Sequence, residues 1–155
     1  MPVVLLDTNA LFLPFQFHID PRKAVPELLG KCDILVPDFV VTEIETMMKA
    51  NVPGARGAHL YAFRYEGVTF EKIVKEKDFD LAQAGGSAKR WPSGMAPQDH
   101  GIEVDRKMVI LAVLMKAYVL TCDNPLRKQL RKAGVPVIFV RNKKTLELDG
   151  QLEVV

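Results

Sequence analysis

The sequence predicts an α/β fold, a three-layer α/β/α sandwich with a mostly parallel central sheet. Short apolar runs without polar alternation, such as 3–6 and 33–36, are typical of strands covered by helices on both faces. Such runs alternate along the chain with segments of helical periodicity, which is the order of βαβ units with right-handed crossovers. The length of 155 residues and the lack of an internal repeat favour a single domain over 1–155.

The composition is that of an ordinary globular protein, with 48% hydrophobic and 26% charged residues. A net charge of +2 neither favours nor excludes a nucleic-acid partner. The two cysteines, Cys32 and Cys122, form no disulfide framework or CxxC metal motif, which indicates a reduced, cytoplasmic protein. We expect no signal peptide, because Asp7 interrupts the first apolar run, and no membrane span, because the apolar stretch 108–115 is too short.

The ends of two predicted helices are marked by capping residues. Asp20 and Pro21 suit the N-cap and first turn of a helix that Gly30 ends. Asn124 and Pro125 begin a later helix in the same way. Helical segments are predicted at 10–17 (a short turn), 21–30, 38–50, 55–66, 78–84, 101–116 and 124–134.

The remaining segments are assigned from turn residues and apolar runs. Glycine, proline and serine recur throughout 85–101, which predicts a long surface loop of the kind that is often functional. The last residues, 141–155, have a polar middle and are predicted to form a terminal hairpin that turns at 149–150. Strands are predicted at 3–6, 33–36, 68–75, 117–121 and 135–140.

Four carboxylates fall at the carboxyl edge of the predicted sheet. Asp7 and Asp123 come directly after two buried strands, whereas Glu43 and Asp105 lie early in helices. A helix that follows a parallel strand runs back along the sheet, so its first turns lie over this edge. We therefore expect the four side chains together at the edge where open α/β sheets bind their ligands.

Each of these acids also has an ordinary structural explanation. An acid at the start of a helix is favoured by the helix dipole, whether or not it has a function. Periodicity does not choose between Glu43 and Glu45, or between Asp105 and Glu103. Together, however, the acids repel one another, and either proton uptake or a bound cation relieves the repulsion. Oxygen donors without cysteine or histidine favour Mg²⁺ or Mn²⁺ over zinc, and these metals most often act on phosphate esters.

A specific family resemblance accompanies this acidic pattern. The chain has Asp-Thr-Asn after an apolar strand, a helical Glu after a Val-Pro opening, an Asp before Ile-Leu-Ala, and Leu-Thr-Cys-Asp at a strand end. The stretch 123–141 (DNPLRKQLRKAGVPVIFVR) adds a basic helix and a further strand. Nearly the whole chain resembles PIN-domain ribonucleases and is most similar to the archaeal set like the PIN nucleases that process ribosomal RNA. The toxin branch of the family, VapC, is a second match.

The resemblance implies roles for individual residues. Glu43 is preferred to Glu45 because it lies at the family's distance from the Val-Pro opening at 36–37. Asn9 and Thr121 match small polar residues that hold the first acid or a metal-bound water, and they are counted with the catalytic residues. The acids that match the family's metal ligands are Asp7, Glu43, Asp105 and Asp123.

The resemblance also implies an activity, that of an Mg²⁺- or Mn²⁺-dependent endoribonuclease in which a metal-activated water attacks the RNA phosphodiester in line. Its expected products are a 5′-phosphate and a 3′-hydroxyl, and its expected setting is rRNA processing or RNA turnover. Arg106 stands where many members have a second Asp after the third acid, which puts a second metal in doubt. The resemblance is compatible with a homodimer and with an antitoxin partner, and no motif decides either.

Two groups of residues are candidates for holding RNA, whether single-stranded or structured. Four cations in pairs spaced by four share one side of the helix 124–134, and a solvated helix face explains them about as well. The loop 85–101 combines two cations with a tryptophan, as single-strand binders do, although the tryptophan could equally pack against the core. The candidates are Arg127, Lys128, Arg131 and Lys132 on the helix and Lys89, Arg90 and Trp91 in the loop.

Other functions compete with this interpretation. A haloacid-dehalogenase-like phosphatase needs Asp-x-Asp after the first strand, where this chain has Asp-Thr-Asn. A receiver domain needs paired acids there and a lysine after a later strand, and neither is evident. A catalytically weak PIN-like scaffold that binds RNA or protein is favoured by Arg106 and disfavoured by the four acids. Cleavage of single-stranded RNA with Mn²⁺, Mg²⁺ or EDTA separates the enzyme from the scaffold.

Overall fold

A computed structural model describes residues 1–68 and 100–150, with the helical backbone alone given for 100–103. Within these residues the strands form one sheet in the order β3-β2-β1-β4-β5-β6. Neighbouring strands are parallel, except that β6 is antiparallel to β5, which confirms the mostly parallel α/β fold. The strands are β1 (Val3–Leu6), β2 (Asp33–Pro37), β3 (Glu66–Val68), β4 (Tyr118–Leu120), β5 (Val137–Arg141) and β6 (Thr145–Asp149).

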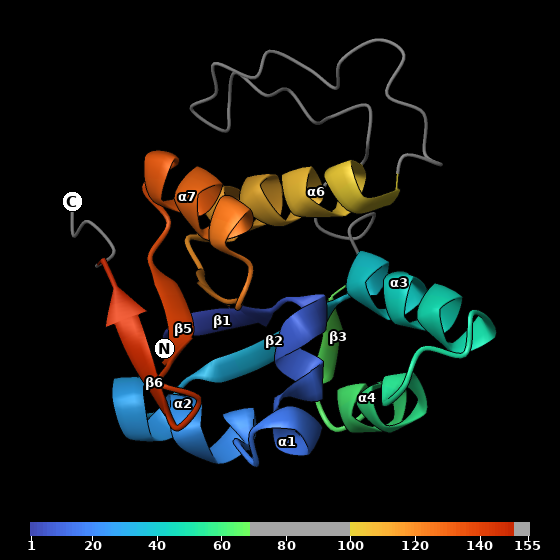
Figure 1. Ribbon diagram of the computed structural model, residues 1–155. Helices are drawn as coiled ribbons and strands as arrows, with labels where there is room; N and C mark the ends of the chain where they lie inside the picture. Colours follow the sequence, from blue (N-terminus) through green and yellow to red (C-terminus); the bar gives the residue numbers. More distant parts are fainter. Residues whose placement is uncertain (69–99, 151–155) are drawn as a thin grey trace, which may run out of the picture.

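Helices cover both faces of this sheet (Figure 1). On one face lie α6 (His100–Met115) and α7 (Asn124–Lys132), which contact each other. On the other face lie α1 (Leu13–Gln16) and α2 (Pro21–Leu29). The three layers expected from the sequence are therefore present. In the part of the chain that the structure describes, no helix has the length and apolarity needed to cross a membrane.

Three further elements lie near the ends of strands β1, β2 and β3. A 3₁₀ turn, η1 (Thr8–Phe12), follows β1 directly. The helix α3 (Asp38–Lys49) follows β2 and packs against α4 (Ala55–Ala62) near β3 (Figure 1). The first turns of η1 and α3 consequently lie at the edge where the parallel strands end.

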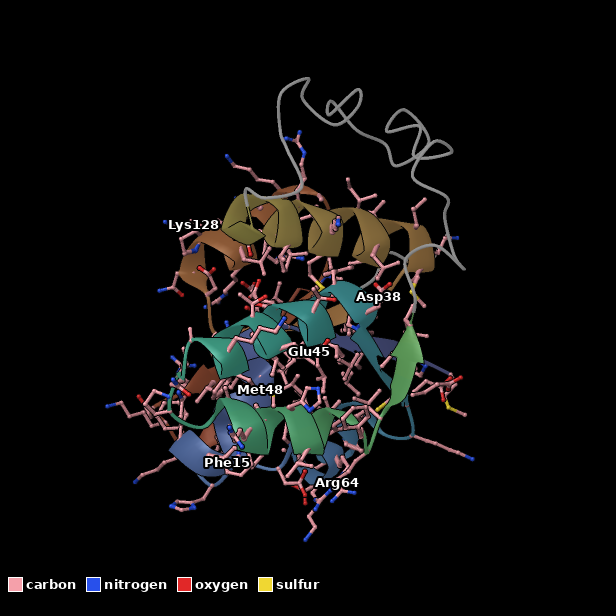
Figure 2. The ribbon with its side chains drawn as sticks, turned by 90° about the vertical axis from the view of Figure 1, so that its right-hand side faces the viewer. Phe15, Asp38, Glu45, Met48, Arg64 and Lys128 are labelled. Atoms are coloured by element: carbon pink, nitrogen blue, oxygen red, sulfur yellow. The ribbon has the colours of Figure 1, made fainter. Side chains whose placement is uncertain are left out.

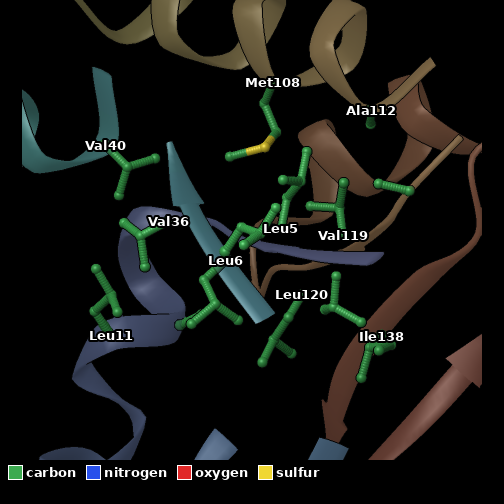
Figure 3. Packing of buried hydrophobic residues seen from close by; sticks show 14 of the residues in the cluster. Leu5, Leu6, Leu11, Val36, Val40, Met108, Ala112, Val119, Leu120 and Ile138 are labelled. Carbon is green, nitrogen blue, oxygen red and sulfur yellow. The ribbon is translucent and has the colours of Figure 1, made fainter. Parts of the chain in front are cut away.

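The core lies on both faces of the central strands β1 and β4. Their register pairs Leu5 with Val119 and Leu6 with Leu120, and successive side chains point to opposite faces. Leu5 and Val119 lie on the side of Met108 from α6, whereas Leu6 and Leu120 lie on the other side of the sheet (Figure 3). All five residues are fully buried, which explains why these strands lack polar alternation in the sequence.

The capping residues act largely as the sequence indicates. The Asp20 carboxylate accepts a hydrogen bond from the Arg22 amide at 3.0 Å, and Gly30, with φ of 80°, follows the last residue of α2. In α7 the boundary lies one residue earlier than predicted. Asp123 occupies the N-cap position and Asn124 is the first helical residue.

The turn of the terminal hairpin lies elsewhere than predicted. The sequence favours a turn at 149–150, but β5 and β6 are joined before those residues. Asn142 and Lys143 have left-handed φ values of 55° and 58°, and the Lys144 amide donates to the Arg141 carbonyl at 3.1 Å. Asn readily adopts this conformation, whereas a Lys in the next position carries no turn signal, so the sequence pattern conceals the turn.

Predicted and observed boundaries also differ around β3. The helix predicted over 55–66 ends at Ala62, and β3 begins at Glu66, two residues before the strand predicted over 68–75. The rest of that strand, the short helix 78–84 and most of the loop 85–101 lie outside the described residues.

Among the described strands, β6 is the outermost next to β5. Leu146 and Leu148 pack against the core, and the residues between and after them are the acids Glu147 and Asp149. Arg141 of β5 donates to Glu147 at 2.6 Å, which adds a charge pair to the ladder of the hairpin.

Candidate active site

A pocket of about 310 Å³ opens at the carboxyl edge of β1 and β4. Asp7 follows β1 and Asp123 follows β4, while Glu43 comes from α3 and Asp105 from α6. All four acids singled out from the sequence line this pocket. Residues that are 116 positions apart in the chain, Asp7 and Asp123, are thus brought together by adjacent strands.

Periodicity left open whether Glu43 or Glu45 belongs to the site, and the structure decides between these two acids. Glu43 lines the pocket, whereas Glu45 of the same helix is exposed and is not among the lining residues (Figure 2 labels Glu45). Residues two apart on a helix point about 200° apart, so only one of the two acids can face the pocket. Asp105 also lines the pocket, while the side chain of Glu103 falls outside the described residues.

Asp7 is the most buried of the four acids, with 4% of its surface exposed. Its Oδ2 accepts hydrogen bonds from the Thr121 hydroxyl at 2.8 Å and from Asn9 Nδ2 at 3.3 Å. Asn9 Oδ1 accepts from the Cys122 amide at 2.8 Å, and Thr121 Oγ1 accepts from the Asp123 amide at 3.1 Å. This network joins the ends of β1 and β4 and fixes the orientation of the Asp7 carboxylate.

Burial and mutual repulsion raise the pKa values of two acids in the pocket. Burial is the largest cause that raises the pKa of Asp7 to about 6; its hydrogen bonds oppose the rise, and the charges of Glu43 and Asp123 add to it. Burial followed by the charges of Asp7, Asp123 and Glu43 raises the pKa of Asp105 to about 7. Near neutral pH the pocket therefore retains protons readily, and a cation would favour its ionised form.

The carboxylates share a pocket without meeting at one point. Over residues 1–68 and 100–150, no three His, Cys, Asp or Glu side chains lie close enough together to enclose a metal ion. The four acids that line the pocket therefore do not form a closed set of metal ligands by themselves. A cation shared by them would have to draw them together or be reached through water.

Thr8 lines the same pocket and is not among the residues that the sequence pattern indicates. It is 7% exposed, and within the described residues its Oγ1 is buried without a hydrogen-bond partner. Nothing in the sequence distinguishes Thr8 from an ordinary residue of the Asp-Thr-Asn motif. The remaining lining residues are Asn9, Phe12, Gln16, Met47, Val52 and Pro53.

A family model described as “PIN like domain” matches residues 4–90, which is more than half of the chain. The chain belongs to the PIN-like domain family. This confirms the family resemblance predicted from the sequence. The matched region of the PIN domain includes Asp7 and Glu43, whereas Asp105 and Asp123 lie beyond it.

The PIN fold extends over nearly the whole chain. A solved structure described as “Structure of the PIN domain endonuclease Utp24” is similar with a TM-score of 0.66 and 22% sequence identity. The similarity covers 99% of this chain and 95% of that one, and so includes the segments that carry Asp105 and Asp123. At this level of identity the likeness shows the fold. No curated protein matches the chain.

A second cleft of this PIN domain, of about 670 Å³, adjoins the acidic pocket. Asp123 lines the pocket, and the next residue, Asn124, lines the cleft. All four cations of α7 that the sequence indicates line the cleft as well, and Asp149 of β6 adds a negative charge. The lining residues are Asn124, Arg127, Lys128, Arg131, Lys132 and Asp149.

The two arginines of the cleft are engaged with the C-terminal hairpin. Arg127 Nε donates to Asp149 Oδ2 at 2.9 Å, and its guanidinium lies 3.7 Å from the centre of the Phe139 ring. Arg131 lies 3.5 Å from the other Asp149 oxygen and donates to the Val135 carbonyl at 3.2 Å. Both side chains therefore fasten β6 to α7, a role that the spacing of the cations along the helix did not indicate.

The two lysines differ from the arginines. Lys128 and Lys132 are exposed, and neither has an ion-pair partner among the described residues (Figure 2 labels Lys128). They are the cations of α7 whose charge is not already balanced. The loop candidates, Lys89, Arg90 and Trp91, lie outside the described residues.

Proposed function

We propose that this PIN domain is an Mg²⁺- or Mn²⁺-dependent endoribonuclease that hydrolyses RNA phosphodiester bonds. The observation that carries the proposal is one pocket lined by four carboxylates next to a cleft lined by four cations. An acidic pocket attracts metal cations, and a cationic cleft attracts the phosphates of a nucleic acid. Membership of the PIN-like domain family and similarity to a protein described as an endonuclease support it.

The donors of the pocket fit a hard divalent cation. No cysteine or histidine is among its described lining residues, and oxygen ligands are those that Mg²⁺ and Mn²⁺ prefer. Asp7, Glu43, Asp105 and Asp123 would hold the cation, directly or through water. When bound there, it supplies a positive charge that stabilises the ionised carboxylates and polarises the phosphodiester for attack by water.

The residues of the chain position this chemistry. Asp7 is held by Thr121 and Asn9, so its carboxylate enters the pocket in a fixed orientation. Because this carboxylate is oriented before the substrate binds, less free energy is needed to bring the reacting groups together. Because an activated water is the attacking group, no nucleophilic side chain is required, and cleavage is expected to leave a 5′-phosphate and a 3′-hydroxyl.

Lys128 and Lys132 are proposed to neutralise phosphates of the bound strand next to the cleavage site. Arg127 and Arg131 line the same cleft, where Asp149 already pairs with both. Lys89, Arg90 and Trp91 remain a further proposed contact for single-stranded RNA. The proposed setting is rRNA processing or RNA turnover in the cytoplasm, with a VapC-type toxin as the second candidate.

The test is cleavage of single-stranded RNA by the purified full chain in Mn²⁺, Mg²⁺ or EDTA. We expect cleavage with either metal, none in EDTA, and none with Asp7→Asn or Glu43→Gln. Glu45→Gln is the matched control, since Glu45 lies two residues away on the same helix and outside the pocket. Cleavage by Asp7→Asn at the rate of the unmodified protein would contradict the proposal.

A scaffold function is the alternative, and Arg106 is the observation that favours it. This arginine lies directly after Asp105, where a further acid would strengthen cation binding. If the metal-loaded protein binds several RNAs and cuts none of them, the scaffold function is the correct one.

A further inference from the structure

The Thr8 hydroxyl is a buried polar group that forms no hydrogen bond within the described part of the fold. Thr8 is 93% buried, and no described atom is a hydrogen-bond partner of its Oγ1. The backbone amide of Thr8 does have one, since it donates to the Asp7 carboxylate. The side chain is therefore the unexplained part of this residue, because a buried hydroxyl without a partner destabilises a fold.

A valine would fill the same volume without that penalty, since valine and threonine share the branched shape and differ in the hydroxyl. Folding alone therefore does not account for threonine at this position. Thr8 lines the acidic pocket next to Asp7, the most buried of the four acids, and its Oγ1 is itself shielded from solvent. Its missing partner is accordingly expected to be something that enters that pocket.

The chemistry of the pocket limits what the partner can be. The four acids do not converge on one point, so a small cation among them would retain part of its water shell. A water molecule both donates and accepts hydrogen bonds, as does a threonine hydroxyl. A change of χ1 rotamer moves the threonine hydroxyl to another staggered position, and such a rotation is how the oxygen would reach the pocket that Thr8 already lines.

We propose that the Thr8 hydroxyl is a further polar group of the cation site, which hydrogen-bonds to the water shell of the divalent cation bound between the acids. Thr8 is thus a positioning residue that acts on the cation through water. This inference rests on the proposed function, because it requires that the acidic pocket binds a cation. It adds a residue that is neither an acid nor part of the network around Thr121 and Asn9.

The test is direct Mn²⁺ binding to the full chain without RNA, measured by calorimetry and by the paramagnetic resonance of free Mn²⁺. We expect Thr8→Val to weaken Mn²⁺ binding roughly tenfold or more, as loss of a hydrogen bond to a metal's surroundings does. Thr8→Ser, which keeps the hydroxyl, should bind Mn²⁺ as the unmodified protein does. Thr145→Val, on the exposed start of β6, is the control for loss of a hydroxyl away from the pocket.

The metal-free protein provides a second readout. Because the orphan hydroxyl is removed, the unfolding midpoint of Thr8→Val in EDTA should equal or exceed that of the unmodified protein. Weaker Mn²⁺ binding together with an undiminished midpoint supports the proposal. An unchanged Mn²⁺ affinity of Thr8→Val overturns it, and if Asp7→Asn abolishes binding in the same experiment, the proposed function still stands. If the unmodified protein binds no Mn²⁺, both proposals fail.

Discussion

The Thr121 hydroxyl donates a 2.8 Å hydrogen bond to the Asp7 carboxylate across the ends of two neighbouring strands. The register of the sheet creates this contact, because Leu6 pairs with Leu120 at the ends of β1 and β4 and the two polar residues directly follow them. The Asp7 amide continues the ladder by donating to the Leu120 carbonyl at 3.1 Å. The position of the most buried acid is therefore a direct result of strand pairing.

Replacing Thr121 by valine should impair both stability and activity. The buried Asp7 carboxylate loses a hydrogen bond and the Asp123 amide loses its acceptor, at a cost of about 1–3 kcal/mol. The bond lowers the pKa of Asp7, so its loss should raise that pKa and move the acidic limb of the pH–rate profile upwards. Thr121→Ser should retain most of both properties. If the acidic limb of the pH–rate profile does not shift in Thr121→Val, the hydrogen bond from Thr121 does not control the ionisation of Asp7.

In the metal-free protein, stability should fall as the pH rises from about 4 to about 7. The folded pKa of Asp7, about 6, lies above the ordinary aspartate pKa of 3.8, so the folded state holds the proton more tightly. The resulting stabilisation is complete below the unfolded pKa and is lost as the pH rises through the folded pKa, about 3 kcal/mol in all. Asp105 contributes in the same direction, with a folded pKa of about 7.

Urea unfolding in EDTA at a series of pH values measures this dependence. Asp7→Asn should flatten the curve, because the amide neither gains nor loses a proton. A free energy of unfolding that rises between pH 5 and 7 would show that these acids do not control the pH dependence.

Divalent cations should stabilise the fold more at pH 8 than at pH 5. Carboxylates must be ionised to bind a metal, and the raised pKa values leave the pocket partly protonated at the lower pH. At a Mn²⁺ concentration of 100 times Kd the gain is about 2.7 kcal/mol. Thermal unfolding with Mn²⁺ and with EDTA at both pH values checks this expectation. An equal shift at both, or a shift that persists in Asp7→Asn, would place the bound cation elsewhere.

The double variant Lys128→Ala/Lys132→Ala should weaken RNA binding without loss of stability. Each lysine that neutralises a phosphate contributes about 0.7 to the slope of log K against log salt for a single strand, so the slope should fall by about 1.4. Lys23→Ala/Lys31→Ala, which removes the same charge from exposed positions in and just after α2, is the control. If the two double variants weaken RNA binding equally, the cleft has no specific role in RNA binding.

Gly150→Ala should destabilise the C-terminal hairpin by about 1–3 kcal/mol. Gly150 has a φ of 91°, and a Cβ there would overlap with the guanidinium of Arg131. Part of the cost should disappear in an Arg131→Ala background, since the overlap is then relieved. A double-mutant cycle by urea unfolding measures this coupling, and strictly additive effects would contradict it.

The parts of the molecule that follow from the sequence are those set by local pattern. Apolar runs identify β1, β2, β4 and β5 because strands buried on both faces have no polar alternation. The acids after β1 and β4 come together because parallel strands end at one edge, and Glu43 faces that edge where Glu45 does not. Once the order of the strands in the sheet is predicted correctly, the topology therefore determines where these acids lie.

Most of the features that escaped prediction depend on partners far apart in the chain, and one depends on the conformation of a local turn. Asp149 pairs with Arg127 and Arg131, and only the folded hairpin reveals that two of the four cations of α7 are already engaged. The Thr8 hydroxyl stands out only when every hydrogen bond around it is known. The turn at 142–144 lacks glycine, so its left-handed residues resemble ordinary polar positions.

The charged hairpin strand β6 has a consequence for association between chains. An outermost strand presents unpaired backbone groups to which the strand of another molecule can add, and this is a common route to aggregation. In β6 the apolar side chains of Leu146 and Leu148 pack inwards, while Glu147 and Asp149 carry negative charge. The same Asp149 is held by two arginines of α7, so β6 is restrained from peeling away. The ion pairs that reduce the free charge of the cleft thereby also keep β6 paired with β5, so that the backbone of β5 is not offered to a strand of another molecule.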